Sequence, residues 1–150
     1  MMKRKLLLLL SILIFVASAS LLVSGSWLLV QPIFFAKNVP LGTITTWAGI
    51  IALPSIIFYS IKGFHPPSDE FMKVFRTINL IIIFIAACWG IVSYFLAGNW
   101  SFSFSGYAEG FIGSDRAYLI FQQFTIFSLV LPMVFVPVFL LGKIVIKKKR

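Results

Sequence analysis

The sequence contains few charged residues, and hardly any acidic ones. Only 11% of its 150 residues are charged, and just four are Asp or Glu. A soluble domain has about 25% charged residues, so this chain lacks the polar side chains that would cover a water-soluble globule. The net charge is +9, but no aromatic residues are interleaved with a basic surface as is typical of nucleic-acid binding. We therefore expect no nucleic-acid partner.

Cysteine and histidine are each present once, as Cys88 and His65. A single thiol forms no disulfide within the chain and supplies no CxxC redox pair. A single imidazole rules out bis-histidine haem ligation by one chain, and a zinc site normally needs several Cys or His ligands. We therefore expect no metal and no cofactor.

The apolar stretches contain no Asp or Glu. Proton-coupled transport usually depends on an ionisable group inside the membrane, so the sequence disfavours a proton antiporter. No motif identifies a nucleophile, and we do not expect an enzyme. A weaker hypothesis is an enzyme that uses Glu109, Asp115 and Arg116 at the membrane surface to act on a lipid headgroup or glycan.

Long hydrophobic runs dominate the chain, which is 60% hydrophobic with a mean hydropathy of +1.03. Four runs are long enough to cross a bilayer as helices, which takes roughly 17–25 apolar residues. We predict an all-α integral membrane protein with a single domain, in which four transmembrane helices form a compact up-down bundle. The predicted helices cover residues 6–30, 43–61, 78–96 and 117–141, with loops at 62–77 and 97–116 and a basic tail at 142–150.

The first apolar run follows three basic residues, an order that is also found in signal peptides. Ala17-Ser18-Ala19 is similar to an A-x-A cleavage site, so removal of residues 1–19 stays open. Against cleavage, apolar residues resume at Leu21 and continue to Val30. We favour an uncleaved anchor helix over residues 6–30.

Basic residues lie almost entirely on one side of the predicted membrane. Of the 13 Lys and Arg residues, only Lys37 and Arg116 are external if both termini are cytoplasmic, which leaves 11 on the cytoplasmic side. The positive-inside rule therefore predicts cytoplasmic N and C termini. The compact build favours a bacterial inner membrane. A glycosylation sequon at Asn99 and a dilysine signal at Lys147 and Lys148 would indicate a eukaryote, but both motifs are short and frequent by chance.

Three amide side chains interrupt the apolar runs, namely Asn79, Gln122 and Gln123. Unpaired amides are costly in lipid, so we expect them to face the bundle interior or another subunit. Ala86 and Gly90 lie four residues apart and form a small-residue face that favours close helix packing. These five residues are the candidate packing and polar-contact sites.

The segment between the third and fourth runs alternates aromatic and small polar residues. An extended chain would direct the rings to one side, against the lipid interface, and the serines toward water. Ser68 is expected to cap the third helix, and Asp115 the fourth with Ser114 as competitor. This short interfacial segment is the predicted surface for an external partner, formed by Trp100, Phe102, Phe104, Glu109, Asp115 and Arg116.

The residue inventory favours an interaction protein over a catalyst. We expect an accessory, assembly or inhibitory subunit that acts through helix contacts, similar in size and span count to small bacteriocin-immunity proteins. Its partners would be the lipid bilayer and another membrane protein or a second copy. The alternative is an oligomeric channel or transporter for a small solute or ion, in which Pro54, Pro132 and Pro137 expose backbone carbonyls to a pathway.

Overall fold

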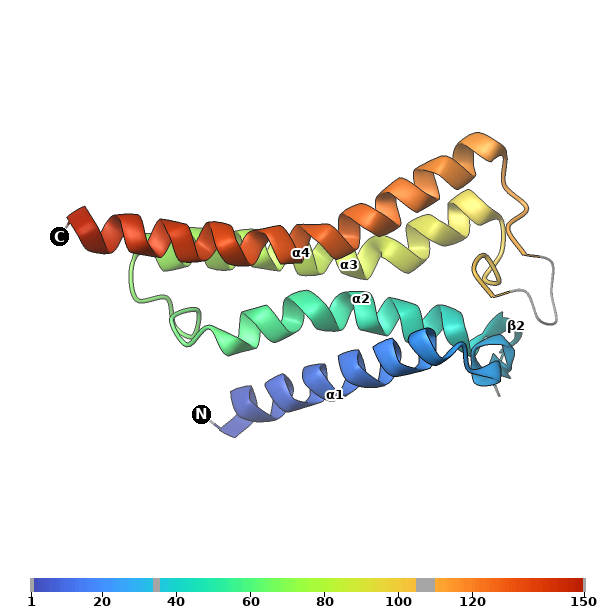
Figure 1. Cartoon of the computed structure of the whole chain (residues 1–150), viewed down its shortest axis with the longest axis horizontal. Helices are drawn as coiled ribbons and strands as arrows, with labels where there is room; N and C mark the ends of the chain where they lie inside the picture. Colours follow the sequence, from blue (N-terminus) through green and yellow to red (C-terminus); the bar gives the residue numbers. More distant parts are fainter. Residues whose placement is uncertain (1, 34–35, 105–109, 150) are drawn as a thin grey trace.

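Four long helices make up most of the chain (Figure 1). The computed structural model describes residues 2–33, 36–104 and 110–149. All four helices are long and apolar enough to cross a membrane, which confirms the predicted number and the all-α class. Their bounds are α1 (Met2–Ser24), α2 (Leu41–Ser60), α3 (Glu70–Ala97) and α4 (Asp115–Lys149).

The helices run in alternating directions, with α1 packed on α2, α2 on α3 and α3 on α4. Two tryptophans tie the last three helices together. Trp47 of α2 donates its indole N–H to the carbonyl of Ala87 in α3 (3.0 Å), and Trp89 of α3 donates to Oγ1 of Thr125 in α4 (2.9 Å). The helix α1 lies at the edge of the bundle. Only 11% of its most apolar 18-residue stretch is buried, against 39% for α2.

The first helix ends sooner than predicted. Instead of one helix over residues 6–30, α1 stops at Ser24 and a short 3-10 helix, η1 (Trp27–Val30), follows. Gly25 adopts a φ of +58°, a left-handed conformation that glycine enters without steric cost and that ends helices. Ser26 then caps η1 by accepting a bond from the Leu28 amide (3.3 Å).

A small β-hairpin precedes the second helix. Strands β1 (Pro32–Ile33) and β2 (Ala36–Pro40) pair antiparallel, with Pro32 opposite Pro40. The Leu41 amide donates to the carbonyl of Gln31 (2.8 Å) and fixes the hairpin to the start of α2. We call this end of the molecule the hairpin end, and the opposite end, where both chain termini lie (Figure 1), the terminal end.

The caps of α3 and α4 differ from the predicted ones. Asp69, not Ser68, caps α3, because its carboxylate accepts a bond from the Met72 amide (2.9 Å). At α4 the competitor prevails: Ser114 accepts a bond from the Ala117 amide (3.3 Å), and Asp115 is the first helical residue. In both cases the cap is the polar residue immediately before the first helical one, the position whose side chain reaches the free amides.

The fourth helix is longer than its predicted span. It continues through the expected tail to Lys149 and contains Pro132 and Pro137. Figure 1 shows α4 bending near its middle, where Pro132 removes one backbone donor. The core has two clusters, each of six buried residues. Toward the hairpin end lie Ile50, Ala86, Trp89, Ala97, Phe102 and Phe121, and toward the terminal end lie Phe58, Phe64, Met72, Ile82, Phe135 and Phe139.

Candidate functional site: a lateral groove, buried amides and a pocket at the hairpin end

Asn79 lies inside the bundle and is fully buried. Neither its Nδ2 nor its Oδ1 contacts a hydrogen-bonding partner among the described residues, and the same holds for Oγ of Ser93 and Ser128. One turn before Asn79, Nε of Arg76 is also buried without a partner. Polar groups of this kind are costly to bury, so the bundle contains a set of destabilising positions along α3 and α4.

Gln122 and Gln123 do not enter the bundle interior; both are exposed on α4. The expectation of an interior position is therefore wrong for these two, and contact with another subunit stays a prediction. Successive helical residues point about 100° apart. Gln122 shares its side of α4 with Leu129, seven residues later, whereas Gln123 points away from the buried side.

Ala86 and Gly90 are both buried on α3. Gly90 faces the ring of Trp47, and a Cβ at position 90 would lie 2.5 Å from the nearest ring atom. The small residue therefore accommodates an indole from α2 and not the backbone of a neighbouring helix.

The aromatic residues after α3 fold back into the bundle instead of lying against lipid. Phe102 is only 4% exposed and packs edge-on against Trp89 and Phe121, each at 5.5 Å between ring centroids. The ring of Phe104 lies over Gly42, where a Cβ would be 2.6 Å away. The predicted lipid-facing arrangement is thus wrong. Burying these rings covers aromatic residues of the core that would otherwise be exposed at the hairpin end.

Trp100 stacks on two other rings. It stacks on Tyr94 at 4.7 Å and on Trp47 at 6.3 Å, with interplanar angles of 28° and 25°. Its carbonyl accepts a bond from the hydroxyl of Thr43 at the start of α2 (2.7 Å). Trp100 is half-buried and belongs to the aromatic packing at this end of the molecule.

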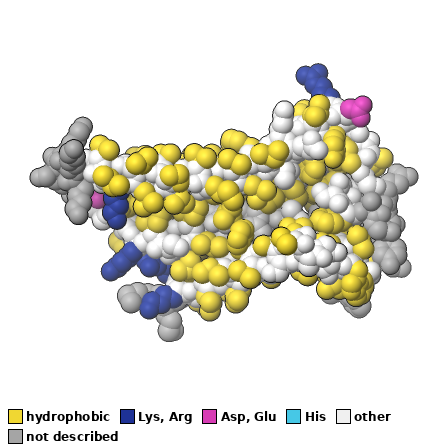
Figure 2. Space-filling model, in the orientation of Figure 1, with side chains coloured by type: hydrophobic (Ala, Val, Ile, Leu, Met, Phe, Trp, Pro, Cys, Tyr) yellow, Lys and Arg dark blue, Asp and Glu magenta, His cyan; other side chains and the backbone are white. Residues whose placement is uncertain are grey.

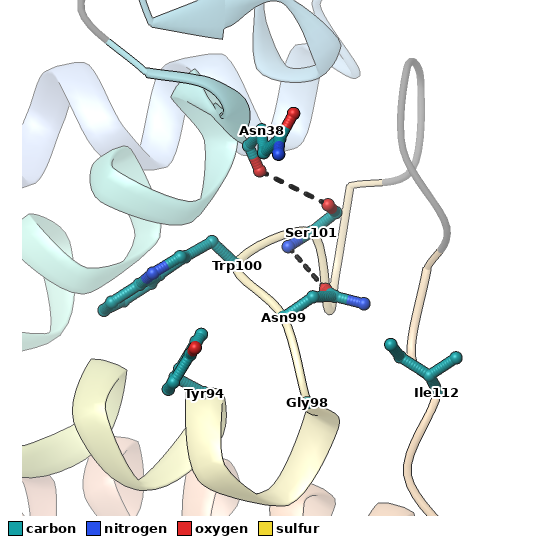
Figure 3. Close-up of a pocket in the computed structure, with 7 residues that line it drawn as sticks. All are labelled: Asn38, Tyr94, Gly98, Asn99, Trp100, Ser101 and Ile112. Atoms are coloured by element: carbon teal, nitrogen blue, oxygen red, sulfur yellow. Dashed lines mark hydrogen bonds between the residues drawn. The ribbon is translucent and has the colours of Figure 1, made fainter.

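A pocket of about 340 Å³ opens beside Trp100, at the hairpin end (Figure 3). Asn99 shapes it: its Oδ1 accepts from the Ser101 amide (2.7 Å), and its Nδ2 donates to the carbonyl of Gly110 (2.6 Å). Ser101 also donates to the carbonyl of Asn38 in β2 (3.5 Å). The described lining has amide, hydroxyl and apolar groups and no charged side chain, and consists of Asn38, Tyr94, Gly98, Asn99, Trp100, Ser101 and Ile112.

Two of the charged residues predicted for an external surface, Asp115 and Arg116, are not among the described lining residues of this pocket. Asp115 and Arg116 are exposed on the first turn of α4, and Glu109 lies outside the described residues. Within the described ranges, no three His, Cys, Asp or Glu side chains are grouped as metal ligands.

A groove between α1, α2 and α4 was not anticipated from the sequence. It has a volume of about 230 Å³. Ser18 and Gly49 bring α1 and α2 close together, since a Cβ at position 49 would lie 2.8 Å from the Ser18 side chain. Ser11 and Ser18 are both buried, and their spacing of seven residues is the signal that indicates this face. The lining residues are Phe15, Ser18, Ala19, Leu22, Val23, Thr46, Gly49, Ile50 and Leu129.

A second groove, of about 260 Å³, lies between α2 and α4 nearer the terminal end. Its α4 wall includes Val136, seven residues beyond Leu129, so the two grooves follow the same side of α4. Their walls are apolar apart from Ser18, Thr46 and Ser60. Of these, Thr46 has a buried Oγ1 without a partner in the described structure, whereas the Ser18 hydroxyl donates to the carbonyl of Thr45.

The grooves, the pocket and the polar side chains described above are the features from which a function can be inferred. No known protein family, curated protein or solved structure matches this chain.

Proposed function

We propose that this chain is an integral membrane protein that acts as an accessory, assembly or inhibitory subunit. It binds a transmembrane helix of a larger membrane protein in the groove between α1, α2 and α4. Both termini lie in the cytoplasm, and a bacterial inner membrane suits the short loops.

The outer surface of the helices supports insertion. Large hydrophobic side chains cover the visible face along the helices (Figure 2), and many are strongly exposed, such as Phe84 at 68% and Leu141 at 63%. Soluble monomers rarely expose continuous apolar patches beyond a few hundred Å². A helix of 20 residues such as α2 is about 30 Å long, which equals the thickness of the hydrocarbon core.

The distribution of charge supports the orientation. Among the side chains coloured in Figure 2, Lys and Arg gather at the terminal end, and basic atoms are also visible at the hairpin end. The segments at the terminal end include Lys62 before α3, Lys73 in its first turns and Lys143 near the end of α4. Positive charge on this scale favours the cytoplasmic side.

Orientation can be measured with cysteines in a Cys88→Ala background. Ser68 and Asn38 are both exposed and lie at opposite ends of the molecule. In intact cells, a membrane-impermeant maleimide should label Asn38→Cys, and should label Ser68→Cys only after permeabilisation. The reverse pattern would overturn the orientation, and release of the chain by alkaline carbonate would overturn insertion.

The groove is the observation on which helix binding rests. Ser18, Ala19 and Gly49 line the groove with small side chains. Small residues allow close approach of a helix backbone in lipid. The buried Oγ1 of Thr46 has no partner among the described residues, and Gln122 lies on the α4 side of the groove. The Trp47–Ala87 and Trp89–Thr125 bonds indicate that Thr46 and Gln122 lie within about one helical turn of each other along the bundle. An apolar helix with one polar side chain therefore fits best.

Site-specific cross-linking in native membranes tests the groove. A photoreactive phenylalanine analogue at position 19 lies in the groove, whereas the same analogue at the exposed position 17 does not. We expect a discrete adduct with a larger membrane protein from position 19 alone. Ala19→Phe should abolish copurification of that protein, and the matched Ala17→Phe should not. Equal adducts from both positions, or adducts with lipid alone, would overturn the proposal.

The second candidate is an oligomeric channel. One observation favours it, namely that Gln122 and Gln123 are exposed on a mostly apolar helix, where amides from several copies would line a shared path. The purified chain in liposomes would then conduct small ions or solutes. Flux no greater than that of empty vesicles would exclude this candidate.

A further inference from the structure

Gln123 lies in the middle of an exposed apolar stripe on α4. The flanking residues Leu119, Ile126 and Val130 are 56%, 61% and 45% exposed. In the series Leu119, Gln123, Ile126 and Val130, successive residues are four, three and four positions apart. This is the heptad spacing by which two helices pack along a seam. This stripe faces away from the buried positions Phe121 and Ser128, and so it differs from the groove.

The exposed amide of Gln123 needs a hydrogen-bonding partner, and none of the described residues supplies one. Gln123 lies five residues further into α4 than Tyr118. This spacing corresponds to about 8 Å along the helix axis, so the amide lies within the apolar span. A primary amide has two donor hydrogens and an acceptor oxygen, and leaving these groups in lipid without partners is unfavourable. Gln122 differs because it points about 100° away, toward the groove.

We infer that a second copy of this chain covers the stripe, in a parallel contact between two α4 helices centred on Gln123. Copies inserted with one orientation can be related only by a symmetry axis along the membrane normal, so each residue meets its counterpart at equal depth. An amide both donates and accepts, and two Gln123 side chains can therefore form reciprocal bonds. A single polar residue in an apolar seam also specifies register and oligomeric state.

This inference rests on the membrane insertion proposed above, but it uses a different side of α4. The groove between α1, α2 and α4 stays open in such a dimer, so a partner helix and a second copy can bind together. The neighbouring glutamines then have separate roles, Gln123 in self-association and Gln122 beside the partner helix.

Energy transfer between donor-labelled and acceptor-labelled copies in phosphatidylethanolamine/phosphatidylglycerol liposomes measures self-association as lipid is added. We expect the wild-type chain to dissociate on dilution with lipid, and Gln123→Leu to associate about 3- to 10-fold more weakly, since interhelical amide bonds in membranes contribute modest free energies. The matched Gln122→Leu should behave as the wild type. In a Cys88→Ala background, Ile126→Cys should form an intermolecular disulfide, and Leu129→Cys, on the groove side, should not.

Three outcomes would overturn the dimer: an inserted but monomeric wild-type chain, an unchanged Gln123→Leu, or equal weakening by both Leu substitutions. Carbonate extraction of the same liposomes separates this failure from the failure of the proposed function. A chain that is extracted was never inserted, and both proposals then fall. A chain that resists extraction but stays monomeric refutes the dimer alone, and the groove can still bind a partner helix.

Discussion

The indole ring of Trp47 in α2 occupies the space in which a side chain at position 90 of α3 would lie. The nearest ring atom is 2.5 Å from the position of a Cβ built on Gly90, and the indole N–H is bonded to the carbonyl of Ala87. The glycine and the tryptophan therefore form one unit of the contact between α2 and α3, and neither is replaceable alone.

Gly90→Ala should lower the free energy of unfolding by about 1–3 kcal/mol, because the added methyl group displaces the indole. The sign of this change is informative, because alanine by itself stabilises a helix relative to glycine by about 1 kcal/mol. In a Trp47→Leu background the same substitution should therefore be neutral or stabilising. SDS titration in detergent measures the unfolding of the wild type, the two single variants and the double variant. If Gly90→Ala lowers the free energy of unfolding equally in both backgrounds, Trp47 is not the cause.

Trp89 and Thr125 should be energetically coupled. Trp89→Phe removes the donor and Thr125→Val the acceptor of their hydrogen bond, while both keep most of the apolar volume. A double-mutant cycle should give a coupling of about 0.5–1.5 kcal/mol. Strictly additive losses would contradict the bond between α3 and α4.

Phe102 should stabilise the hairpin end of the bundle by its burial. Phe102→Ala removes a ring that packs on Trp89 and Phe121, and we expect a loss of about 3–5 kcal/mol in the free energy of unfolding. Phe95→Ala is the matched control, because Phe95 is 77% exposed and its loss should cost less than about 1 kcal/mol. Similar losses for the two variants would place Phe102 outside the core.

Asn79→Leu should stabilise the protein. Both amide atoms of Asn79 are buried and unpaired in the described structure, so a leucine of similar size removes a desolvation penalty of about 1–3 kcal/mol. The exposed Asn38→Leu should have little effect on the same unfolding measurement. A destabilised Asn79→Leu would mean that the amide has a partner in the membrane, and would make the bundle interior a binding site.

The number of helices and their approximate positions follow from the apolar runs, because only a helix satisfies every backbone group over such a length in lipid. The ends of the helices follow less directly. Ser24, Gly25 and Ser26 interrupt the first run, yet the apolar residues after them suggested one continuous helix. Asp69 and Ser68 are both good caps, and the chain geometry at the loop selects between them.

The faces of the helices were not predictable in the same way. Apolar residues surround α2 and α4 on nearly every side, so periodicity does not indicate which side is buried. For this reason the sequence does not decide whether Gln122 and Gln123 face the bundle interior or another subunit, and the structure places both on the surface. The alternating rings after α3 were equally ambiguous, because an extended segment can turn them toward lipid or back onto Trp89.

Composition and residue order alone therefore decide that this chain forms four long apolar helices with most of its basic residues at one end. The physical reason is local, since backbone hydrogen bonding and hydropathy depend on neighbours in the sequence. Three-dimensional packing decides the contact of the Trp47 ring with Gly90 and the burial of Phe102. It also decides the groove beside Ser18 and the different directions in which Gln122 and Gln123 point. Those features depend on how each helix is rotated against the next, which short-range contacts between side chains fix only once the helices meet.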